Sequence, residues 1–320
     1  MTDLKAYEYV LAVVRAGGIS AAAEALGIAQ PTLSRYIKKL EDDLGMPLFD
    51  RSTAPISLTA AGECFAETGR RLCDAERQMF KRLEQLRGAA RTVIRIGISP
   101  SRAPYLMPGI AARFTRECPD VRLVMAEGTT AALNAMLRGG ELDLLISLDE
   151  ETDAAFVRVP LFSETLLLAF PAAVGEGLSF EALLSRVPLI RIGHTLVLSR
   201  AMDALTAALG LPSPAFECGS VESALALVRA GIGAALLPSY TANQTGDSAA
   251  VRFAAVPDGI ASVTETHCRR QVCLFYRREQ FLSQAEQQLI ACIRAQTAAD
   301  NVHHPGNCKI AYLHRPKGDI

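Results

Sequence analysis

The chain has 320 residues, of which 50% are hydrophobic and 21% charged, and its formal net charge is −1 at pH 7. This composition excludes an intrinsically disordered chain, and the length suits about two domains of ordinary size. Even residues 1–90 hold equal numbers of basic and acidic side chains, which excludes DNA binding through bulk positive charge. A DNA-binding surface would have to arise from the local placement of basic residues.

The N-terminal residues and the cysteines indicate the compartment. The start, MTDLKAYEYV, carries Asp3, Lys5 and Glu8 where an export signal needs an apolar core. The longest apolar run, near residues 165–174, is too short to cross a membrane. The eight cysteines include no Cys-x-x-Cys pair, so we expect small buried thiols rather than a metal site or disulfides. We predict a cytoplasmic protein with no membrane partner, cofactor or metal.

Two short helices are expected first. Apolar residues three and four positions apart predict an amphipathic helix from Leu4 to Val14, which Gly17 ends. Ser20 is the expected N-cap of a second, alanine-rich helix, and Gly27 closes it. The close spacing of these signals predicts two consecutive helices.

A third helix begins directly afterwards. Pro31 lacks a backbone donor and has a preset φ, so we expect it at the first helical position with Gln30 as the N-cap. One face of this helix is apolar, and we predict burial of Leu33, Ile37, Leu40 and Leu44. The opposite face is polar and basic. Such a helix after a short helix and a tight turn is typical of a helix-turn-helix that reads the major groove.

A small hairpin that fits a wing is expected next. Residues 48–49 and 56–58 favour β-structure, and the tip between them is polar and basic. The alternative is that the basic helix face is only solvated. The residues predicted to contact DNA are Gln30, Pro31, Thr32, Ser34, Arg35, Lys38, Lys39, Arg51 and Ser52.

Thr59 is the expected cap of a long helix that extends towards residue 88. Apolar residues recur in it every seven positions, which is the spacing of a helix that pairs with another helix. The residues predicted to form this dimerisation seam are Phe65, Leu72, Met79 and Leu86.

The run AAAEALGIAQPTLSRYIKKLEDDLGMPLFDRSTAPISLTAAGE, residues 21–63, carries a family resemblance. It resembles the N-terminal winged helix-turn-helix of the LysR-type bacterial transcriptional regulators. The shared signatures are the alanine-rich second helix, Gln-Pro-x-Leu-Ser, Leu-Glu-x-x-Leu-Gly, Pro-Leu-Phe-x-Arg and Leu-Thr-x-x-Gly, in the same order. The resemblance extends over residues 3–90. It implies a DNA-binding regulator that works as a homodimer or homotetramer.

After residue 92 the pattern changes to alternating strands and helices, which predicts βαβ units and a parallel sheet. The α/β fold class follows from this alternation. The predicted strands lie at 93–99, 121–128, 142–148, 156–170, 189–193, 214–220, 234–238 and 269–278, and the predicted helices at 105–118, 130–140, 197–210, 221–231 and 283–295.

Two α/β lobes with a ligand cleft between them are expected from this order. The segment is similar to the effector-binding domain of the same family, which is itself like type 2 periplasmic binding proteins. That resemblance implies chain crossings between the lobes near 162–164 and 264–268. The predicted parts are a DNA-binding domain (1–59), a linker or dimerisation helix (60–90), an effector-binding domain (91–300) with lobe I at 91–162 plus 268–297 and lobe II at 163–267, and a tail (301–320).

Three strand-to-helix turns are candidates for the effector site. Unpaired backbone donors and the positive end of a helix dipole favour an anionic group at such turns. The alternative is that the hydroxyls there only cap their helices. The turn residues are Ser99, Ser101, Thr129, Thr130, Ser220 and Val221.

The family resemblance adds two residues to the candidate effector site and supports two that the turns already suggest. It puts Ser101 and Thr130 at positions that often contact the effector, with His194 and Thr195 reaching from the second lobe. Arg102 is a candidate counter-charge, and the nearby Glu222 would oppose a highly charged ligand. We therefore predict a small organic anion as effector.

The sequence predicts a transcriptional regulator that is not an enzyme. Nucleophile-elbow, zinc-protease and phosphate-loop motifs do not occur, and the Gly-x-Gly of AGIGAALLP follows a helix instead of a strand. The alternative function is a cytoplasmic solute-binding protein or an α/β enzyme whose N-terminal part is only an interaction module.

Overall fold

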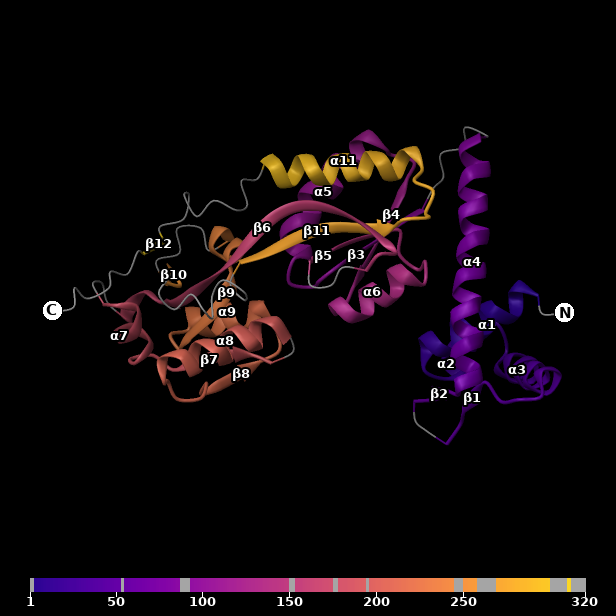
Figure 1. Cartoon of the computed structure of the whole chain (residues 1–320), viewed down its shortest axis with the longest axis horizontal. Helices are drawn as coiled ribbons and strands as arrows, with labels where there is room; N and C mark the ends of the chain where they lie inside the picture. Colours follow the sequence, from indigo (N-terminus) through magenta and orange to yellow (C-terminus); the bar gives the residue numbers. More distant parts are fainter. Residues whose placement is uncertain are drawn as a thin grey trace.

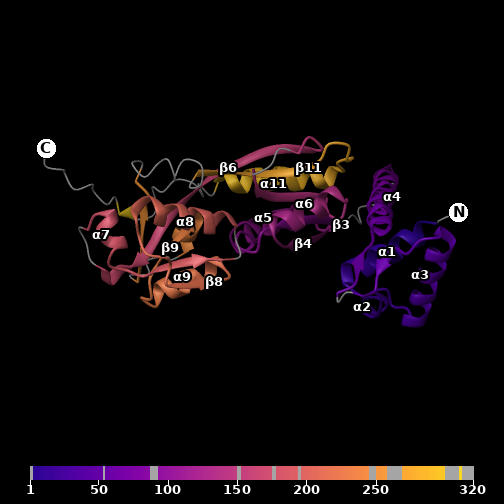
Figure 2. The same cartoon turned by 60° about the horizontal axis from the view of Figure 1, so that its bottom comes forward.

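A computed structural model of the chain describes residues 3–52, 55–86, 93–149, 153–174, 178–193, 196–244, 250–257, 269–299 and 310–311. Figure 1 shows a small helical unit around the lower half of one long helix, and two α/β lobes beside it, the first lobe lying between the long helix and the second lobe. The helical unit and the second lobe stand at opposite ends in a turned view as well (Figure 2). None of the helices in the described residues combines the length and the apolar character that crossing a bilayer requires.

The N-terminal unit has three helices and a small hairpin. Its elements are α1 (Leu4–Ala16), α2 (Ile19–Ala25), α3 (Gln30–Leu44), β1 (Phe49–Asp50) and β2 (Ser57–Leu58). The two short strands pair antiparallel, as expected for the wing. Leu33, Ile37 and Leu40 of α3 are buried in the core with α1 and α2, as predicted. The predicted burial of Leu44 is only partial, because it is half-buried at the end of the helix.

Two of the predicted helix starts are wrong by one or two residues. Gly18 is the N-cap of α2, and Ser20 lies inside its first turn. Ala29 is the N-cap of α3, so Gln30 is already helical. The carbonyl of Ala29 accepts hydrogen bonds from Thr32 and Leu33, which leaves no capping role for the Gln30 side chain. Backbone bonds alone therefore begin both helices.

The long helix α4 (Ala60–Leu86) begins as predicted. The amide of Gly62 donates to Thr59 Oγ1 at 3.0 Å, and the amide of Glu63 donates to the Thr59 carbonyl. Thr59 Oγ1 in turn donates to the carbonyl of Pro47 at 2.7 Å. The cap of α4 is thereby joined to the start of the wing.

The two lobes share one ten-stranded sheet in the order β4-β3-β5-β11-β6-β9-β7-β8, with β10 and β12 off this path. The first-lobe elements are β3 (Val93–Ile98), α5 (Ala103–Glu117), β4 (Arg122–Glu127), α6 (Thr130–Arg138), β5 (Leu144–Leu148), β11 (Arg269–Arg277) and α11 (Gln284–Ala299). The others are β6 (Phe156–Pro171), η1 (Ala172–Val174), α7 (Phe180–Leu184), β7 (Leu189–Ile192), α8 (Leu196–Leu209), β8 (Phe216–Cys218), α9 (Val221–Arg229), β9 (Ala234–Pro238), η2 (Ser239–Gln244), β10 (Val251–Ala255) and β12 (Ile310–Ala311).

The strand β6 runs through both lobes. Its residues up to Thr165 pair with β11, and those from Leu166 pair with β9. The expected crossing at 162–164 therefore lies within one continuous strand, just before the change of partner. The expected return crossing at 264–268 lies outside the described residues.

The predicted βαβαβ unit is confirmed, because β3 pairs in parallel with both β4 and β5. The short 3-10 helices η1 and η2, the helix α7 and the strands β10 and β12 were not predicted. The helix α7 has only five residues, too few to show a helical period, and the amide of Ala182 donates to its cap Ser179. The strand β10 pairs antiparallel with the end of β6.

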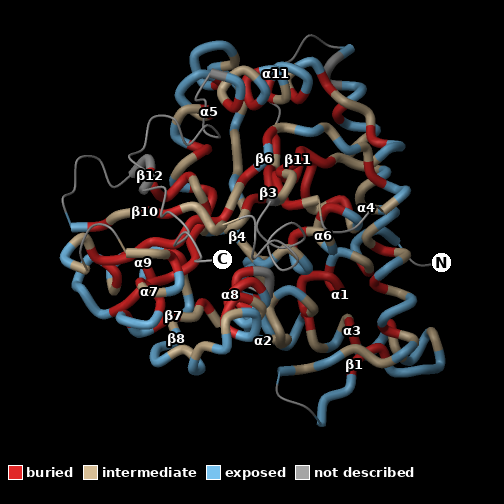
Figure 3. Tube along the Cα trace, turned by 60° about the vertical axis from the view of Figure 1, so that its left-hand side comes forward, coloured by how far each residue is buried: buried red, intermediate tan, exposed pale blue. Residues whose placement is uncertain are grey.

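Each lobe has its own buried core. Buried residues follow the strands, and exposed residues cover the outer turns of the helices (Figure 3). In the first lobe α5 and α11 pack on one face of the sheet, where Ile96, Ile110 and Ile293 are fully buried. On the other face Leu133 and Leu137 of α6 pack against Phe275. Both faces are covered, as a parallel sheet requires.

The joint between α4 and the first lobe contains a buried ion trio. Lys81 of α4 is 9% exposed, and its Nζ donates to Asp143 Oδ1 and, at 2.9 Å, to Glu286 Oε1. Glu286 also accepts from the amide and hydroxyl of Ser283, and Asp143 accepts from the amide of Arg95. The surrounding donors satisfy both carboxylates, so α4 is held against two separate segments of the lobe.

We expect Lys81→Met to destabilise this joint by about 3 to 5 kcal/mol, because it leaves two buried carboxylates without their cation. Thermal melts and amide hydrogen exchange in α4 measure the effect. Lys39→Met, which removes an exposed lysine from α3, is the matched control and should change stability by less than about 0.5 kcal/mol. Equal melting and exchange in both variants would show that the trio does not hold the helix.

Candidate functional site

The polar face of α3 is open to solvent. Most of the side chains predicted there are exposed: Gln30, Pro31, Thr32, Arg35, Lys38 and Lys39, with Ser34 half-buried. Arg35 Nε donates to the carbonyl of Pro31 at 3.2 Å, which aligns the guanidinium along the first turn. The first turns of the helix therefore present donors outward, as direct reading of base edges in the major groove requires.

Tyr36 fixes the inner side of the same helix. Its hydroxyl donates to Asp3 Oδ1 at 2.9 Å, and Asp3 is also the N-cap of α1. Burial and the Asp3 carboxylate raise the pKa of Tyr36 to about 12, so the phenol stays protonated at neutral pH. This hydrogen bond sets the position of α3 relative to α1.

Glu41 connects α3 to the wing. Its Oε1 accepts from the amides of Leu48 at 2.8 Å and Phe49 at 3.1 Å, and its Oε2 pairs with Arg51 at 2.9 Å. The predicted DNA contact Arg51 is therefore already paired, although its side chain is 46% exposed. The second wing residue, Ser52, donates to Asp50 Oδ1 at 2.6 Å and lowers the pKa of that carboxyl. Sequence reasoning missed Glu41, although it is the glutamate of the Leu-Glu-x-x-Leu-Gly signature.

The predicted seam of α4 is divided. Leu72, Met79 and Leu86 are 42%, 48% and 83% exposed, and Leu83 adds a further exposed side chain at 41%. Phe65 is different, because its ring stacks on Tyr7 with centroids 4.5 Å apart. It belongs to the core of the N-terminal unit. The exposed apolar stripe thus consists of Leu72, Met79, Leu83 and Leu86.

In the first lobe two of the predicted turns are neighbours. Ile98 pairs with Glu127 at the carboxyl ends of β3 and β4, so the turns that follow them lie side by side. Thr129 Oγ1 accepts from the amide of Ala132 at 3.3 Å and caps α6. Thr130, the next residue, is half-buried. The capping interpretation is correct for the Thr129 hydroxyl.

The second lobe has a matching pair of turns. Ile192 pairs with Cys218 at the carboxyl ends of β7 and β8. Ser220 Oγ accepts from the amide of Ser223 at 3.0 Å and caps α9, whose first residue, Val221, is buried. The predicted contacts His194 and Thr195 follow β7 but lie outside the described residues.

Arg102 belongs to an internal ion network. Its Nη2 and Nε contact both carboxylate oxygens of Glu164, at 2.7 and 3.1 Å, and its Nη1 donates to Ser99 Oγ at 3.1 Å. Arg270 Nη2 pairs with the same carboxylate. Ser99 and Ser101 Oγ lie 3.3 Å apart beside this network. Arg102 shares the fully buried Glu164 with Arg270, and its role as a ligand counter-charge stays a prediction.

Tyr105 and Tyr240 bring the lobes together. Their ring centroids, one on α5 and one on η2, are 4.5 Å apart. Burial raises the pKa of both, and the charge of Glu222 on α9 raises that of Tyr105 further. Tyr240 also lies close to Arg102, Glu164 and Ser101. Sequence reasoning missed this group, although Glu164 is visible as a charge inside an apolar strand.

Comparison with protein families agrees with this arrangement. Residues 4–63 match the model of the bacterial regulatory helix-turn-helix protein of the lysR family, and residues 87–298 match that of the LysR substrate binding domain. The chain belongs to the LysR family. It is a DNA-binding transcriptional regulator with an effector-binding domain. The family matches favour this function over the solute-binding or enzymatic alternative.

Relatives in the LysR family include regulators named for peroxide. The DNA-binding transcriptional dual regulator OxyR of Escherichia coli K12 is 30% identical over 302 residues, 92% of this chain and 95% of that protein. A probable hydrogen peroxide-inducible genes activator of Streptomyces viridosporus is 32% identical over 230 residues, 70% of this chain and 73% of its own length.

Solved LysR-type structures share the fold. Full-length OxyR of Pseudomonas aeruginosa, with a cysteine replaced by aspartate, has a TM-score of 0.65 at 22% identity and covers 99% of both chains. CbnR, a LysR family transcriptional regulator, has a TM-score of 0.62 at 22% identity and covers 92% of this chain and 99% of its own.

We expect Glu41→Ala to loosen the wing of this LysR-type domain. The change removes the acceptor of two backbone amides, which costs about 1 to 3 kcal/mol when the amides stay buried. Amide exchange at Leu48 and Phe49 should become faster, and the domain should unfold at lower denaturant. Asp43→Ala, an exposed change on the same helix, should leave both unchanged. If exchange at Leu48 and Phe49 were unaltered in Glu41→Ala, Glu41 would not be the residue that anchors the wing.

Proposed function

We propose that the chain is a cytoplasmic, non-enzymatic regulator that reads DNA through the N-terminal turns of α3 and responds to a small organic anion between its lobes. The single observation that supports the DNA part most strongly is the open polar face of α3 beside a wing held by Glu41. Arg35, Ser34 and Gln30 would contact base edges, and Lys38 and Lys39 would contact phosphates.

The regulator would act as a homodimer or homotetramer. The exposed stripe of Leu72, Met79, Leu83 and Leu86 on α4 is apolar and follows the heptad spacing of paired helices. Pairing two chains would place two recognition helices on one DNA site, as dimeric helix-turn-helix proteins do.

The effector would bind at the paired turns of the two lobes. Backbone donors at the start of α6 and α9 and the hydroxyls of Ser101 and Thr130 favour an anion there. Because Thr129 and Ser220 cap their helices, we assign the side-chain contacts to Ser101 and Thr130, with His194 and Thr195 as further candidates. The ligand would shift an equilibrium between lobe arrangements.

Peroxide sensing is the second candidate, since several relatives are named as hydrogen peroxide-inducible genes activators. A peroxide-sensing cysteine needs an accessible thiol with a lowered pKa. Burial instead raises the pKa of five of the six thiols among the described residues: Cys73, Cys118, Cys218, Cys273 and Cys292. The sixth, Cys64, is exposed but lies on α4, outside the effector-binding domain, and Cys268 and Cys308 lie outside the described residues. The organic-anion proposal is therefore favoured.

We expect Arg35→Ala to weaken binding to DNA selected by the wild-type protein by about 1 to 3 kcal/mol, with relaxed sequence preference. Lys38→Ala should weaken binding to all DNA sequences alike. It should also lower the slope of log affinity against log salt by about one, the contribution of one phosphate contact. Gel-shift titrations at fixed salt measure both. Arg116→Ala is the matched control, because Arg116 makes the same contact to a carbonyl four residues earlier but lies on α5. Wild-type affinity in Arg35→Ala would exclude base reading by this residue.

We expect Thr130→Val to weaken effector binding by at least about tenfold, because it keeps the shape and removes the hydroxyl. Thermal-shift screening of organic acids and aromatic metabolites identifies the effector, and calorimetry measures its affinity. DNA binding without effector should be unchanged. Thr115→Val, on the surface of α5, is the control. Equal affinity in Thr130→Val, or binding of cations only, would contradict the proposed site.

A further inference from the structure

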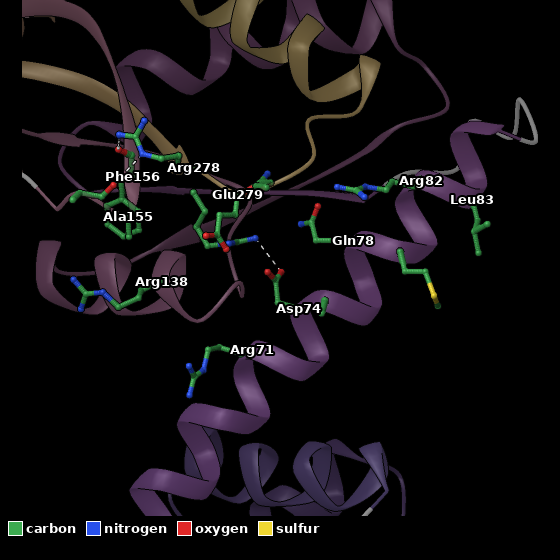
Figure 4. Close-up of a pocket in the computed structure, with 15 residues that line it drawn as sticks. Arg71, Asp74, Gln78, Arg82, Leu83, Arg138, Ala155, Phe156, Arg278 and Glu279 are labelled. Carbon is green, nitrogen blue, oxygen red and sulfur yellow. Dashed lines mark hydrogen bonds and ion pairs between the residues drawn. The ribbon is translucent and has the colours of Figure 1, made fainter.

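A cavity of about 840 Å³ lies between α4 and the first lobe, away from the turns between the lobes. Its size falls in the range of small-molecule sites. Figure 4 shows Arg71, Asp74, Gln78 and Arg82 on the side of α4 that faces the lobe. Opposite them the first lobe contributes Arg138, Ala154, Ala155, Phe156, Arg278 and Glu279.

The cavity carries an excess of positive charge. Five arginines line it, against two lining carboxylates, Asp74 and Glu279. Asp74 pairs with Arg277 at 2.9 Å, and Asp153 outside the cavity pairs with Arg138. The lining therefore has three more arginines than carboxylates, drawn from both sides of the joint, and the pairing of Arg138 with Asp153 lowers this excess to two. Such a set favours an anionic group, which guanidinium ions bind through paired N–H donors.

The three remaining arginines are held loosely. Arg71 is 4.0 Å from Glu67, and its side chain is 70% exposed. Arg82 lies over the ring of Phe281 at 5.1 Å, and Arg278 donates only to backbone carbonyls. An incoming anion would meet guanidinium groups that are positioned by their surroundings but only weakly neutralised.

The rest of the lining is apolar or unsatisfied. Phe156 and Ala155 of the first lobe provide a surface that an apolar body would cover, whereas Met79 and Leu83 lie at the rim and belong to the exposed stripe of α4. In the wall, Gln78 Nε2 and Gln280 Oε1 are buried without a hydrogen-bond partner among the described residues. Their other amide atoms bind the Phe281 amide and Glu286, which fixes both orientations. Both unpaired atoms are shielded from solvent, so a ligand in the cavity would reach them only after side chains of the wall had moved.

We propose that this cavity is a second ligand site, distinct from the one between the lobes, which takes an organic anion with an apolar body. Arginines from α4 and from the first lobe would contact the same ligand. Binding would therefore stabilise the docked position of α4 and be coupled to any change that moves the helix. The inference stands independently of the effector between the lobes.

The test uses the full chain and three probes of one shape: naphthalene-2-carboxylate, its neutral carboxamide and 2-naphthylmethylammonium. We expect the carboxylate to raise the melting temperature and to bind at least about tenfold more tightly than the other two. The double variant Arg71→Gln/Arg82→Gln should lose this preference. The control Arg116→Gln/Arg122→Gln, which removes the same charge from exposed positions outside the cavity, should keep it.

Thr130→Val separates the two sites. Carboxylate binding that survives Thr130→Val and is lost in Arg71→Gln/Arg82→Gln supports the cavity. Loss in Thr130→Val alone, equal binding of all three probes, or no binding would overturn the proposal. Sedimentation velocity adds a further outcome: if the arginine variants alter only the oligomeric state, the cavity belongs to a contact with a second copy of the chain, and the proposal is wrong.

Discussion

The contact of Lys81 with Asp143 and Glu286 determines how the parts of this molecule are connected. A charged trio in a site shielded from water tolerates little displacement, because each partner would be left without its counter-charge. These ion pairs join α4 to the first lobe, and the N-terminal end of α4 is attached to the wing and α3. We interpret α4 as the element through which a change in the effector-binding domain reaches the DNA-binding face.

Local signals in the sequence predict most of the helices and strands, and long-range pairs account for what they miss. The apolar period of α3 and the alternation of β3, α5 and β4 are properties of neighbouring residues, so both could be predicted. Lys81 and Glu286 are 205 positions apart, and no pattern in the sequence around either residue indicates that the two would pair. Ser20 and Gln30 were assigned as caps from residue type, whereas backbone carbonyls of Gly18 and Ala29 begin those helices.

The candidate sites show the same limit. Thr129 and Ser220 were chosen because hydroxyl residues suit anion binding at helix starts, but the same residues are favoured as caps, and here they cap. Arg102 was chosen for its positive charge, and only the folded chain shows that its guanidinium pairs with Glu164. In contrast, the exposure of Arg35 and Lys38 follows directly from the helical period, which the sequence contains in full.

The position of β11 and α11 after the core elements of the second lobe has a consequence for biosynthesis. Both belong to the first lobe, yet the ribosome makes them after the whole second lobe. The cores of the N-terminal unit and the second lobe are each made from one contiguous stretch of sequence and can form as soon as that stretch emerges. The first lobe lacks a central strand and Glu286 until β11 and α11 have been made. A nascent or truncated chain would thus hold a folded DNA-reading unit on an undocked helix. Control by the effector-binding domain would begin only after β11 and α11 have been made.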